Sequence, residues 1–382
     1  MSSLHEVSGH SLTLLHTSEE YFPRLFVAIH EANKSVYIET YIFAADEIGS
    51  LLKQALELAA ARKVSVHLLL DGFGSADLPA SWLDEMRKRG VHVLWFRPEL
   101  ARLSLHRNRL RRMHRKLVLI DGHIAFVGGI NIIAELDVPH LDYAVEVQGP
   151  VVAEIAYSMN KLWRMVSWTN FRRSGHRIEQ LRQRTEHKEV QFVIRDNLRH
   201  RRDIEHAYLR AIAQAQHEVI IANAYFFPGR HYRRELLKAA QRGVRIVLFL
   251  QGKIEFRLQH YATLALYEEL LQAGIEIHEY TKSFLHAKVA VVDGRWATVG
   301  SSNIDPFSLW LAREGNLMVN DSNFAEALRA SLIHEMQHGA RQVTQEEWCQ
   351  RGWWDRMVLY MSYFLIRLLV DMVGYVHKID DI

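Results

Sequence analysis

The stretch His114-Arg-Lys-Leu-Val-Leu-Ile-Asp-Gly122 occurs a second time as His286-Ala-Lys-Val-Ala-Val-Val-Asp-Gly294. The two copies lie 172 residues apart, and the same offset relates three further pairs: Gly128 and Gly300, Asn131 and Asn303, Asp142 and Glu314. A single His-x-Lys-x4-Asp pattern would carry a real risk of a chance match. Two copies in one shared register instead indicate a duplicated chain.

Looser matches extend the duplication upstream of each copy. The apolar runs at 36–43, 64–70 and 91–96 correspond to those at 219–227, 244–250 and 275–280. Apolar residues in 48–59 follow the three- and four-residue spacing of an amphipathic helix, and 236–240 begin its counterpart. Each half therefore reads as β-α-β-α-β followed by a hairpin. This order predicts an α/β fold in which each half has a mixed, mostly parallel sheet flanked by helices.

Three segments are expected along the 382 residues. The first half covers 1–180 with its motif at 114–121, and the second covers 181–345 with its motif at 286–293. They join in a polar stretch around 170–190. The remainder, 346–382, is expected to be an apolar, amphipathic, membrane-associating tail. We expect the halves to pack about a pseudo-two-fold axis with one active site at their interface.

Composition excludes several classes of protein. Hydrophobic residues make up 49% and charged residues 24%, which is typical of a globular protein and not of a disordered one. The single cysteine, Cys349, excludes a disulfide scaffold and a four-cysteine zinc module. No signal peptide is apparent at the N-terminus, and no charge-free apolar run reaches the ~18 residues of a confident membrane span.

The motif divides its residues between two faces. In a strand from 114 to 120, His114 and Lys116 point to the same side because side chains alternate. Asp121 points to the other side and belongs to an Asp-Gly pair, the usual signal of a hairpin turn. His and Lys are therefore the candidates for contact with substrate, and Asp121 is a turn or supporting residue. The alternative interpretation is a duplicated structural hairpin with solvated His and Lys.

Two His and two Lys at one interface suit phosphodiester chemistry. A neutral imidazole can attack phosphorus and form a phosphohistidine, while the second imidazole protonates the leaving oxygen. Lysine ammonium groups can hold the charge on the non-bridging oxygens, so no metal or other cofactor is expected. Asp142 and Glu314 are candidates to orient the two rings. Tyr41 and Tyr225 end matching strands, either lining the pocket or serving as ordinary half-buried strand aromatics.

These motifs resemble those of the phospholipase D superfamily and, within it, the bacterial cardiolipin synthases of the short B type. The likeness runs from about residue 8 to 345 and rests on five stretches: 38–43, 70–75, 112–116, 125–131 and 300–305. It implies metal-independent transfer of a phosphatidyl group between two phosphatidylglycerols, with glycerol leaving. It further implies one active site between the halves, with a phosphatidyl-histidine intermediate and His114 as the nucleophile.

The resemblance also implies the site residues. The catalytic set consists of the two motifs: His114, Lys116, Asp121, His286, Lys288 and Asp293. The expected substrate-binding and supporting residues are Asn131, Asn303, Ser301, Asp142, Glu314, Tyr41 and Tyr225. Gly129 departs from the family pattern, since many members have serine there, and this argues against a hydroxyl role at that position. Ser301 keeps the serine in the second half.

Two segments have compositions that indicate contact with a lipid membrane. An insert at 97–113 mixes arginines with leucines, which suits an anionic lipid surface, although a solvated loop is the simpler alternative. The tail from Trp353 to Lys378 has only a narrow polar stripe and predicts a helix lying in the membrane interface. The alternatives are that this helix packs onto the core or forms a dimer contact. We therefore expect a peripheral enzyme on the cytoplasmic side of the inner membrane. Its partners would be phosphatidylglycerol and the membrane surface, without nucleic acid; oligomeric state is left open.

Three alternatives remain. A hydrolytic phospholipase D or a nuclease would use the same motifs with water as acceptor or DNA as donor. His334-Glu335-Met-Gln-His338 matches the His-Glu-x-x-His helix motif of zinc peptidases. The helical pattern of its neighbours turns His334 outward, however, and no third ligand is evident. A catalytically silent phosphate-binding or membrane scaffold is the third alternative, against which both intact motifs argue.

Overall fold

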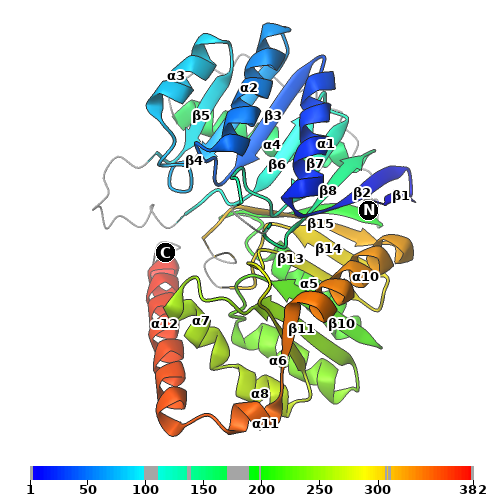
Figure 1. Cartoon of the computed structure of the whole chain (residues 1–382), viewed down its shortest axis with the longest axis vertical. Coiled ribbons are helices and arrows are strands. Elements are labelled where there is room, and N and C mark those ends of the chain that lie inside the picture. The colour runs from blue at the N-terminus through cyan, green and yellow to red at the C-terminus, as the bar shows by residue number, and fades with distance from the viewer. Residues whose placement is uncertain are drawn as a thin grey trace.

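The computed structural model describes residues 3–98, 111–135, 139–169, 189–197, 199–305, 308 and 311–379, without the side chains of 169 and 370–379. Within these ranges the chain forms two eight-stranded sheets, one from each half (Figure 1). The expected duplicated α/β fold is thus confirmed. The proposed boundary between 180 and 181 falls outside the described residues.

The two sheets have matching strand orders. The first runs β1 (Leu4–Val7), β2 (His10–His16), β8 (Tyr143–Gln148), β7 (Ile124–Gly128), β6 (Lys116–Ile120), β3 (Ser35–Thr40), β4 (Ser65–Asp71), β5 (His92–Phe96). The second, given in the matching direction, runs β9 (Val190–Arg195), β15 (Glu314–Asn320), β14 (Trp296–Gly300), β13 (Lys288–Val292), β10 (Glu218–Asn223), β11 (Arg245–Gln251), β12 (Glu276–Tyr280), β16 (Ala340–Val343). β9 corresponds to β2, and β1 and β16 are additions at opposite edges. Each motif strand, β6 or β13, therefore lies between the first strand of its β-α-β unit and its own hairpin partner.

The sheets are mixed, as expected, but the expectation that most strand pairs are parallel is wrong. Only the neighbours β3–β4–β5 and β10–β11–β12 pair in parallel among the described strands. These are the strands joined through helices, which return the chain to the same end of the sheet. All the other pairs are antiparallel. In the motif hairpins β6–β7 and β13–β14 a three-residue connection reverses the chain.

Helices cover the outer faces and fill the space between the sheets. α1 (Thr17–Glu31), α2 (Glu47–Ala61) and α3 (Ala80–Lys88) pack on the outer face of the first sheet. α5 (Asp203–Gln214), α6 (Arg230–Gln241), α7 (Arg257–Leu264) and α8 (Tyr267–Gln272) do so on the second. α4 (Val151–Thr169) and α10 (Ser322–Gly339) share one core with the inner faces of both sheets. The two halves are therefore joined by a continuous apolar core.

α11 (Gln345–Cys349) and α12 (Trp353–Ile379) close the chain, and α12 runs beside α7 (Figure 1). Leu359 and Ile366 of α12 are buried in the core on the outer face of the second sheet. The helix expected at 353–378 is thus present, and one of its faces packs on the protein. Among the described residues, none of the helices is apolar over a length sufficient to cross a bilayer.

Both motif hairpins turn at their Asp-Gly pair, as the sequence predicts. Asp121 and Gly122 have φ of +52° and +74°, and Asp293 and Gly294 have +51° and +60°. Two consecutive positive φ angles are typical of a type I′ turn. The Asp121 carboxylate accepts the backbone N–H groups of residues 33–35 at 2.7–2.8 Å. Asp293 accepts those of residues 216–218 at 2.8–2.9 Å. Each aspartate therefore fastens the hairpin to the start of the neighbouring strand.

Asp121→Ala is expected to lower the free energy of unfolding by about 1–3 kcal/mol, because three N–H donors lose their acceptor. The left-handed backbone adds strain for alanine. Asp121→Asn keeps a side-chain oxygen and tolerates this backbone, so it should cost less. Urea unfolding measures both changes. Turnover by the folded fraction should stay close to wild type; a large loss of turnover without loss of stability would contradict the turn role.

Candidate active site

The two motifs meet because each half pairs with the other just before its histidine. The His114 N–H donates to the Arg313 carbonyl at 2.9 Å, and the His286 N–H donates to the Leu141 carbonyl at 2.9 Å. Met113 and Arg313, and likewise Leu285 and Leu141, form isolated parallel bridges. Arg313 and Leu141 are themselves 172 residues apart. The contact between halves therefore obeys the same two-fold relation as the repeat.

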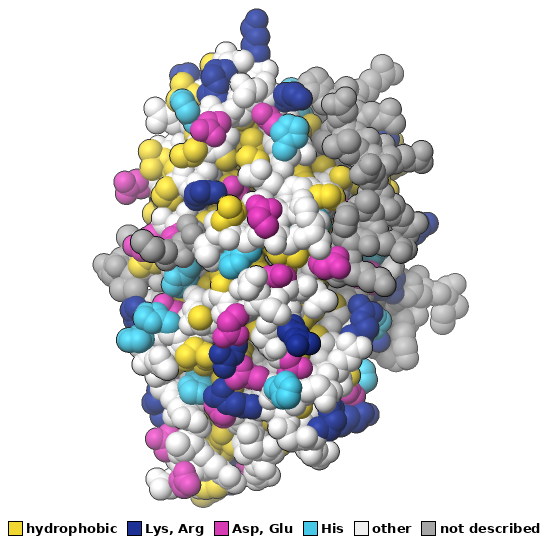
Figure 2. All heavy atoms as spheres, turned by 90° about the vertical axis from the view of Figure 1, so that its right-hand side faces the viewer, with side chains coloured by type: hydrophobic (Ala, Val, Ile, Leu, Met, Phe, Trp, Pro, Cys, Tyr) yellow, Lys and Arg dark blue, Asp and Glu magenta, His cyan; other side chains and the backbone are white. Residues whose placement is uncertain are grey.

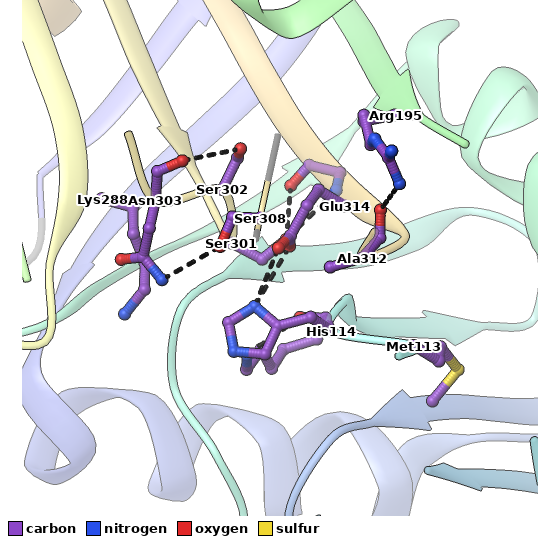
Figure 3. A network of polar contacts seen from close by, with 12 residues as sticks. Met113, His114, Arg195, Lys288, Ser301, Ser302, Asn303, Ser308, Ala312 and Glu314 are labelled. Atoms are coloured by element: carbon purple, nitrogen blue, oxygen red, sulfur yellow. Dashed lines mark hydrogen bonds and ion pairs between the residues drawn. The ribbon is translucent and has the colours of Figure 1, made fainter. Parts of the chain in front are cut away.

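Each histidine is held by a carboxylate from the opposite half. His114 Nδ1 lies 3.0 Å from Oε1 of Glu314, and His286 Nδ1 lies 2.6 Å from Oδ2 of Asp142 (Figure 3 shows the first pair). A carboxylate at Nδ1 fixes the tautomer in which Nε2 carries a lone pair. Both Nε2 atoms are thereby prepared to attack or to exchange a proton. For each of the two motif histidines, the carboxylate that holds Nδ1 therefore comes from the other half.

The two lysines are buried beside the histidines. Lys116 Nζ donates to the His114 carbonyl at 2.9 Å, and Lys288 Nζ donates to the His286 carbonyl. Burial, and then the charge of Lys288, lowers the pKa of Lys116 to about 7. Burial lowers the pKa of Lys288 to about 8, although Asp142 and Glu314 oppose it. Buried ammonium groups with lowered pKa values indicate a site that awaits an anion.

Burial also governs the charge of the histidines. It lowers the pKa of His114, with Glu314 opposing the change. It lowers the pKa of His286 well below the ordinary value, and Lys288 and Lys116 add to this effect. Both imidazoles are therefore neutral in the free site near pH 7. Burial raises the pKa of Asp142 to about 6, against the opposing charge of Lys288.

The residues after each hairpin complete the floor of the site. Asn303 is buried near Lys288 and donates to Ser308 Oγ at 3.5 Å (Figure 3). The side-chain oxygens of Asn131 and Asn303 are buried without a hydrogen-bond partner among the described residues. Buried amide atoms of this kind are rare in folded proteins unless a ligand supplies the partner. The two asparagines are therefore suitable for contact with a polar substrate.

The departure at Gly129 has a steric reason. A Cβ at this position would lie 2.4 Å from Oδ1 of Asp142, the carboxylate that orients His286. In the second half Ser301 occupies the equivalent position and donates to Glu314 Oε2 at 2.5 Å (Figure 3). The longer glutamate leaves room for a serine, whereas the shorter aspartate requires glycine.

The two tyrosines differ in their surroundings. The Tyr41 ring packs edge-on against His114 with centroids 4.8 Å apart, and Lys116 Nζ lies 5.3 Å from the ring centre. Tyr225 donates its hydroxyl hydrogen to Glu255 and its ring contacts Phe256. Tyr41 therefore lines the histidine side of the site, while Tyr225 is bound to the connection before α7.

Two supporting residues had no assigned role in the sequence analysis. Asp71, at the end of β4, accepts the N–H of Met113 at 2.7 Å. Gln251, at the end of β11, accepts the N–H of Leu285 at 3.3 Å. Each fixes the backbone one residue before a motif histidine. Their only sequence signal is that both end corresponding strands of the repeat.

The His-Glu-x-x-His segment in α10 does not form a metal-binding arrangement. His334 and His338 are exposed, but Glu335 is buried and accepts from the Tyr280 hydroxyl at 3.4 Å. Its other oxygen lies 3.7 Å from Nε2 of His16. The glutamate therefore points away from the two histidines. No group of three or more potential ligands is placed to hold a metal among the residues that the structure describes.

Comparison with known proteins defines the class. A family model described as "Cardiolipin synthase, PLD-like domain" matches residues 25–163 and 208–336, which are most of both halves. The fold and the paired motifs are those of a duplicated phospholipase D-like enzyme. Cardiolipin synthase B of Escherichia coli strain K12 is 39% identical over 377 residues, covering 96% of this chain and 90% of that protein. The chain therefore belongs to the cardiolipin synthase family with a phospholipase D-like domain.

Further relatives agree with this assignment. The cardiolipin synthase of Geobacillus kaustophilus is 30% identical over 373 residues, covering 96% of this chain and 74% of that protein. The solved phosphatidylserine synthase of Haemophilus influenzae Rd KW20 superposes with a TM-score of 0.69, covering 95% and 94% of the two chains. Because the two sequences are only 14% identical, this similarity supports the fold alone. The expectation of a phosphatidyltransferase of the cardiolipin synthase type is confirmed at this level.

Proposed function

We propose that the chain transfers the phosphatidyl group of one phosphatidylglycerol to the glycerol hydroxyl of a second, producing cardiolipin and free glycerol. The observation that carries this proposal is the crosswise pairing of His114 with Glu314 and His286 with Asp142 around two buried lysines. This arrangement supplies two equivalent imidazoles on either side of one phosphate position. The family to which the chain belongs supports the choice of lipid.

The reaction proceeds by two displacements at phosphorus. In the first, Nε2 of one imidazole forms a bond to phosphorus while the bond to the glycerol oxygen breaks. The second imidazole, which takes up a proton at Nε2 when the phosphodiester binds, gives that proton to the leaving oxygen. In the second, the second imidazole takes the proton of the incoming hydroxyl, whose oxygen bonds to phosphorus as the P–N bond breaks. The resemblance noted above implies His114 as the nucleophile, and this order of roles stays a prediction.

The remaining side chains hold the phosphate. Lys116 and Lys288 provide positive charge where the non-bridging oxygens gain charge in each transition state. Asn131 and Asn303 offer amide groups beside them. Binding of the phosphodiester anion also raises the pKa of the imidazole that must act as an acid. These fixed groups are sufficient for the proposed steps.

A lipid turnover assay tests the proposal. Purified protein would be incubated with phosphatidylglycerol vesicles in EDTA, and lipids and glycerol would be quantified by mass spectrometry. Cardiolipin and glycerol in equal amounts are expected. Phosphatidic acid as the main product would show that water is the acceptor and that the hydrolytic alternative holds. Loss of activity in EDTA with recovery on adding zinc would contradict the metal-independent mechanism.

The pH profile of kcat/KM for phosphatidylglycerol is expected to be bell-shaped. Below about pH 6 Asp142 becomes protonated and no longer holds the Nδ1–H of His286. Between about pH 7 and 8 Lys116 and Lys288 lose their protons, so kcat/KM falls as the pH rises. The alkaline limb of kcat should lie at higher pH, because bound phosphodiester favours the ammonium forms. A constant kcat/KM between pH 7 and 10 would contradict the role of the lysines.

The outer face of α12 is suitable for docking on a lipid surface, and we propose that it brings the enzyme to the membrane as a peripheral protein on its cytoplasmic side. Large apolar side chains are exposed along the helix: Trp353, Trp354, Met357, Val358, Tyr360, Met361, Phe364, Leu365, Leu368 and Leu369. None of the exposed residues from 357 to 369 is charged. Ile254, Phe256 and Leu258, next to and within α7, extend this surface. On the face opposite α12, charged and apolar side chains are interspersed (Figure 2).

Met361→Glu combined with Phe364→Glu is expected to weaken binding to phosphatidylglycerol vesicles by about 100-fold or more, since each buried apolar side chain contributes about 1.5–3 kcal/mol. Vesicle sedimentation measures the binding, and turnover of detergent-dispersed lipid should be preserved. Leu51→Glu with Leu58→Glu, two exposed apolar residues of α2, is the matched control. Equal loss in both double variants, or no loss in either, would contradict docking through α12.

A further inference from the structure

The surroundings of the two motif histidines differ in charge, although their backbones are related by the two-fold axis. Arg111, Arg112 and Arg313 lie on the side of His114. The residues related to them by the repeat on the side of His286 are Ser283, Phe284 and Leu141. The backbone of these segments is nonetheless equivalent in the two halves. The positive charge near His114 therefore comes from these particular side chains, and the shared fold does not require it.

Arg97 interacts electrostatically with both Arg112 and Arg313, and the backbone of the last two adjoins that of His114. The N–H of Arg313 donates to the Arg112 carbonyl at 2.8 Å, and the Arg313 carbonyl accepts the His114 N–H. Arg313 and Arg97 lie against the same Phe96 ring, at 5.8 and 5.7 Å from its centre. Arg112 lies 4.2 Å above the Phe73 ring. These arginines come from three different segments, so the tertiary fold assembles the cluster.

Among the described residues of this region, positive charge exceeds negative charge. Arg97, Arg111, Arg112 and Arg313 interact with one another and with two deeper arginines, Arg115 and Arg195. The acidic groups that face these six arginines are Glu39, Asp71, Asp196 and Glu314. Glu39 is paired with Arg115, one of the six arginines, and Glu314 with His114, while Asp71 and Asp196 also accept backbone N–H groups. Six arginines therefore face four carboxylates in the described part of this region.

The side chain of Arg313 gives an independent indication of a missing ligand. Its Nε is buried without a hydrogen-bond partner, and NH2 contacts only the sulfur of Met165 at 3.7 Å among the bonds that involve described residues. Burial, with the neighbouring charge of Arg115, lowers the pKa of Arg313 to about 10. A planar guanidinium in this state gains most from a bidentate anion such as a phosphate.

We propose that Arg97, Arg112 and Arg313 form a second anion site, which binds the phosphodiester of the acceptor lipid while the first phosphate lies between the histidines. This inference rests on the proposed function, in which the acceptor is itself a phosphodiester. A glycerol unit separates the two phosphates of the product, so the site suits either order of roles for His114 and His286. The site would favour an anionic lipid acceptor over an uncharged alcohol.

The test compares two acceptors in the same protein. Cardiolipin synthesis uses phosphatidylglycerol as acceptor, whereas incorporation of labelled glycerol into phosphatidylglycerol uses an acceptor without a phosphate. In Arg112→Gln with Arg313→Gln, the ratio of synthesis to exchange is expected to fall about 10- to 100-fold, from the loss of charge-assisted bonds worth about 1.5–3 kcal/mol. Arg87→Gln, an exposed arginine of α3, is the matched control and should leave the ratio unchanged.

Three outcomes would overturn the inference. Equal loss of synthesis and exchange would show a general effect on the site, and an unchanged ratio would show that the arginines do not hold the acceptor. Faster glycerol exchange by wild type in added inorganic phosphate would indicate a site for a free anion instead. Failure of the proposed function is distinguishable, since wild-type protein would then exchange or hydrolyse lipid without making any cardiolipin.

Discussion

Replacement of either His114 or His286 by alanine is expected to slow cardiolipin formation by about 10⁴-fold or more. Residues that act as a unit in covalent catalysis show losses of this size when one member is removed. One variant lacks the nitrogen that bonds to phosphorus, and the other lacks the group that moves the proton. Initial rates with phosphatidylglycerol vesicles measure the effect.

His334→Ala is the matched control, because His334 is an exposed histidine of α10 outside the site. Thermal unfolding of all three variants should resemble that of wild type. If either site variant keeps more than about one hundredth of the rate, that imidazole takes no covalent or proton-transfer part. If both do, the paired motifs are structural and the account of the site fails.

The second large effect is expected from the carboxylates that orient the histidines. Asp142→Asn and Glu314→Gln should each lower kcat by about 10²–10⁴-fold, because an amide no longer fixes the tautomer with a free Nε2. The shape of each side chain is preserved, so stability should change little. The loss should appear in kcat more than in KM, since the substrate contacts stay in place.

Proton NMR distinguishes this positioning role from a general disturbance. In wild-type protein each His Nδ1–H that bonds to a carboxylate should give a downfield resonance. Asp142→Asn should remove the resonance of His286 and Glu314→Gln that of His114, each in the opposite half. Glu326→Gln, a change at an exposed residue of α10, should remove neither. Loss of the wrong resonance would contradict the crosswise pairing.

Much of the local structure could be predicted from the repeat. The strands at 64–70 and 244–250, the helix at 48–59 and the Asp-Gly turns all appear where the patterns place them. Alternation along each motif strand also put His and Lys on one face and the aspartate on the other. These features depend on neighbours in sequence, which a periodic pattern reports directly.

The features that escaped prediction depend on contacts between distant segments. The sequence marks Asp142 and Glu314 as candidates to orient the rings, but it does not show which histidine each one holds, because both pairs cross between halves. The outer strands β1, β9 and β16 are short and join their sheets antiparallel, which made the expected share of parallel pairs too high. Asp71 and Gln251 act through backbone N–H groups, which leave no trace in side-chain patterns.

The most direct test of the account is capture of the covalent intermediate. Wild-type protein would be mixed with phosphatidylglycerol, denatured rapidly at alkaline pH to preserve phosphohistidine, digested, and examined by mass spectrometry. The account predicts a phosphatidyl group on the peptide that contains His114 or on the one that contains His286, and no such adduct in the variant lacking both. An enzyme that makes cardiolipin without any adduct, or with the adduct on another residue, would contradict the account.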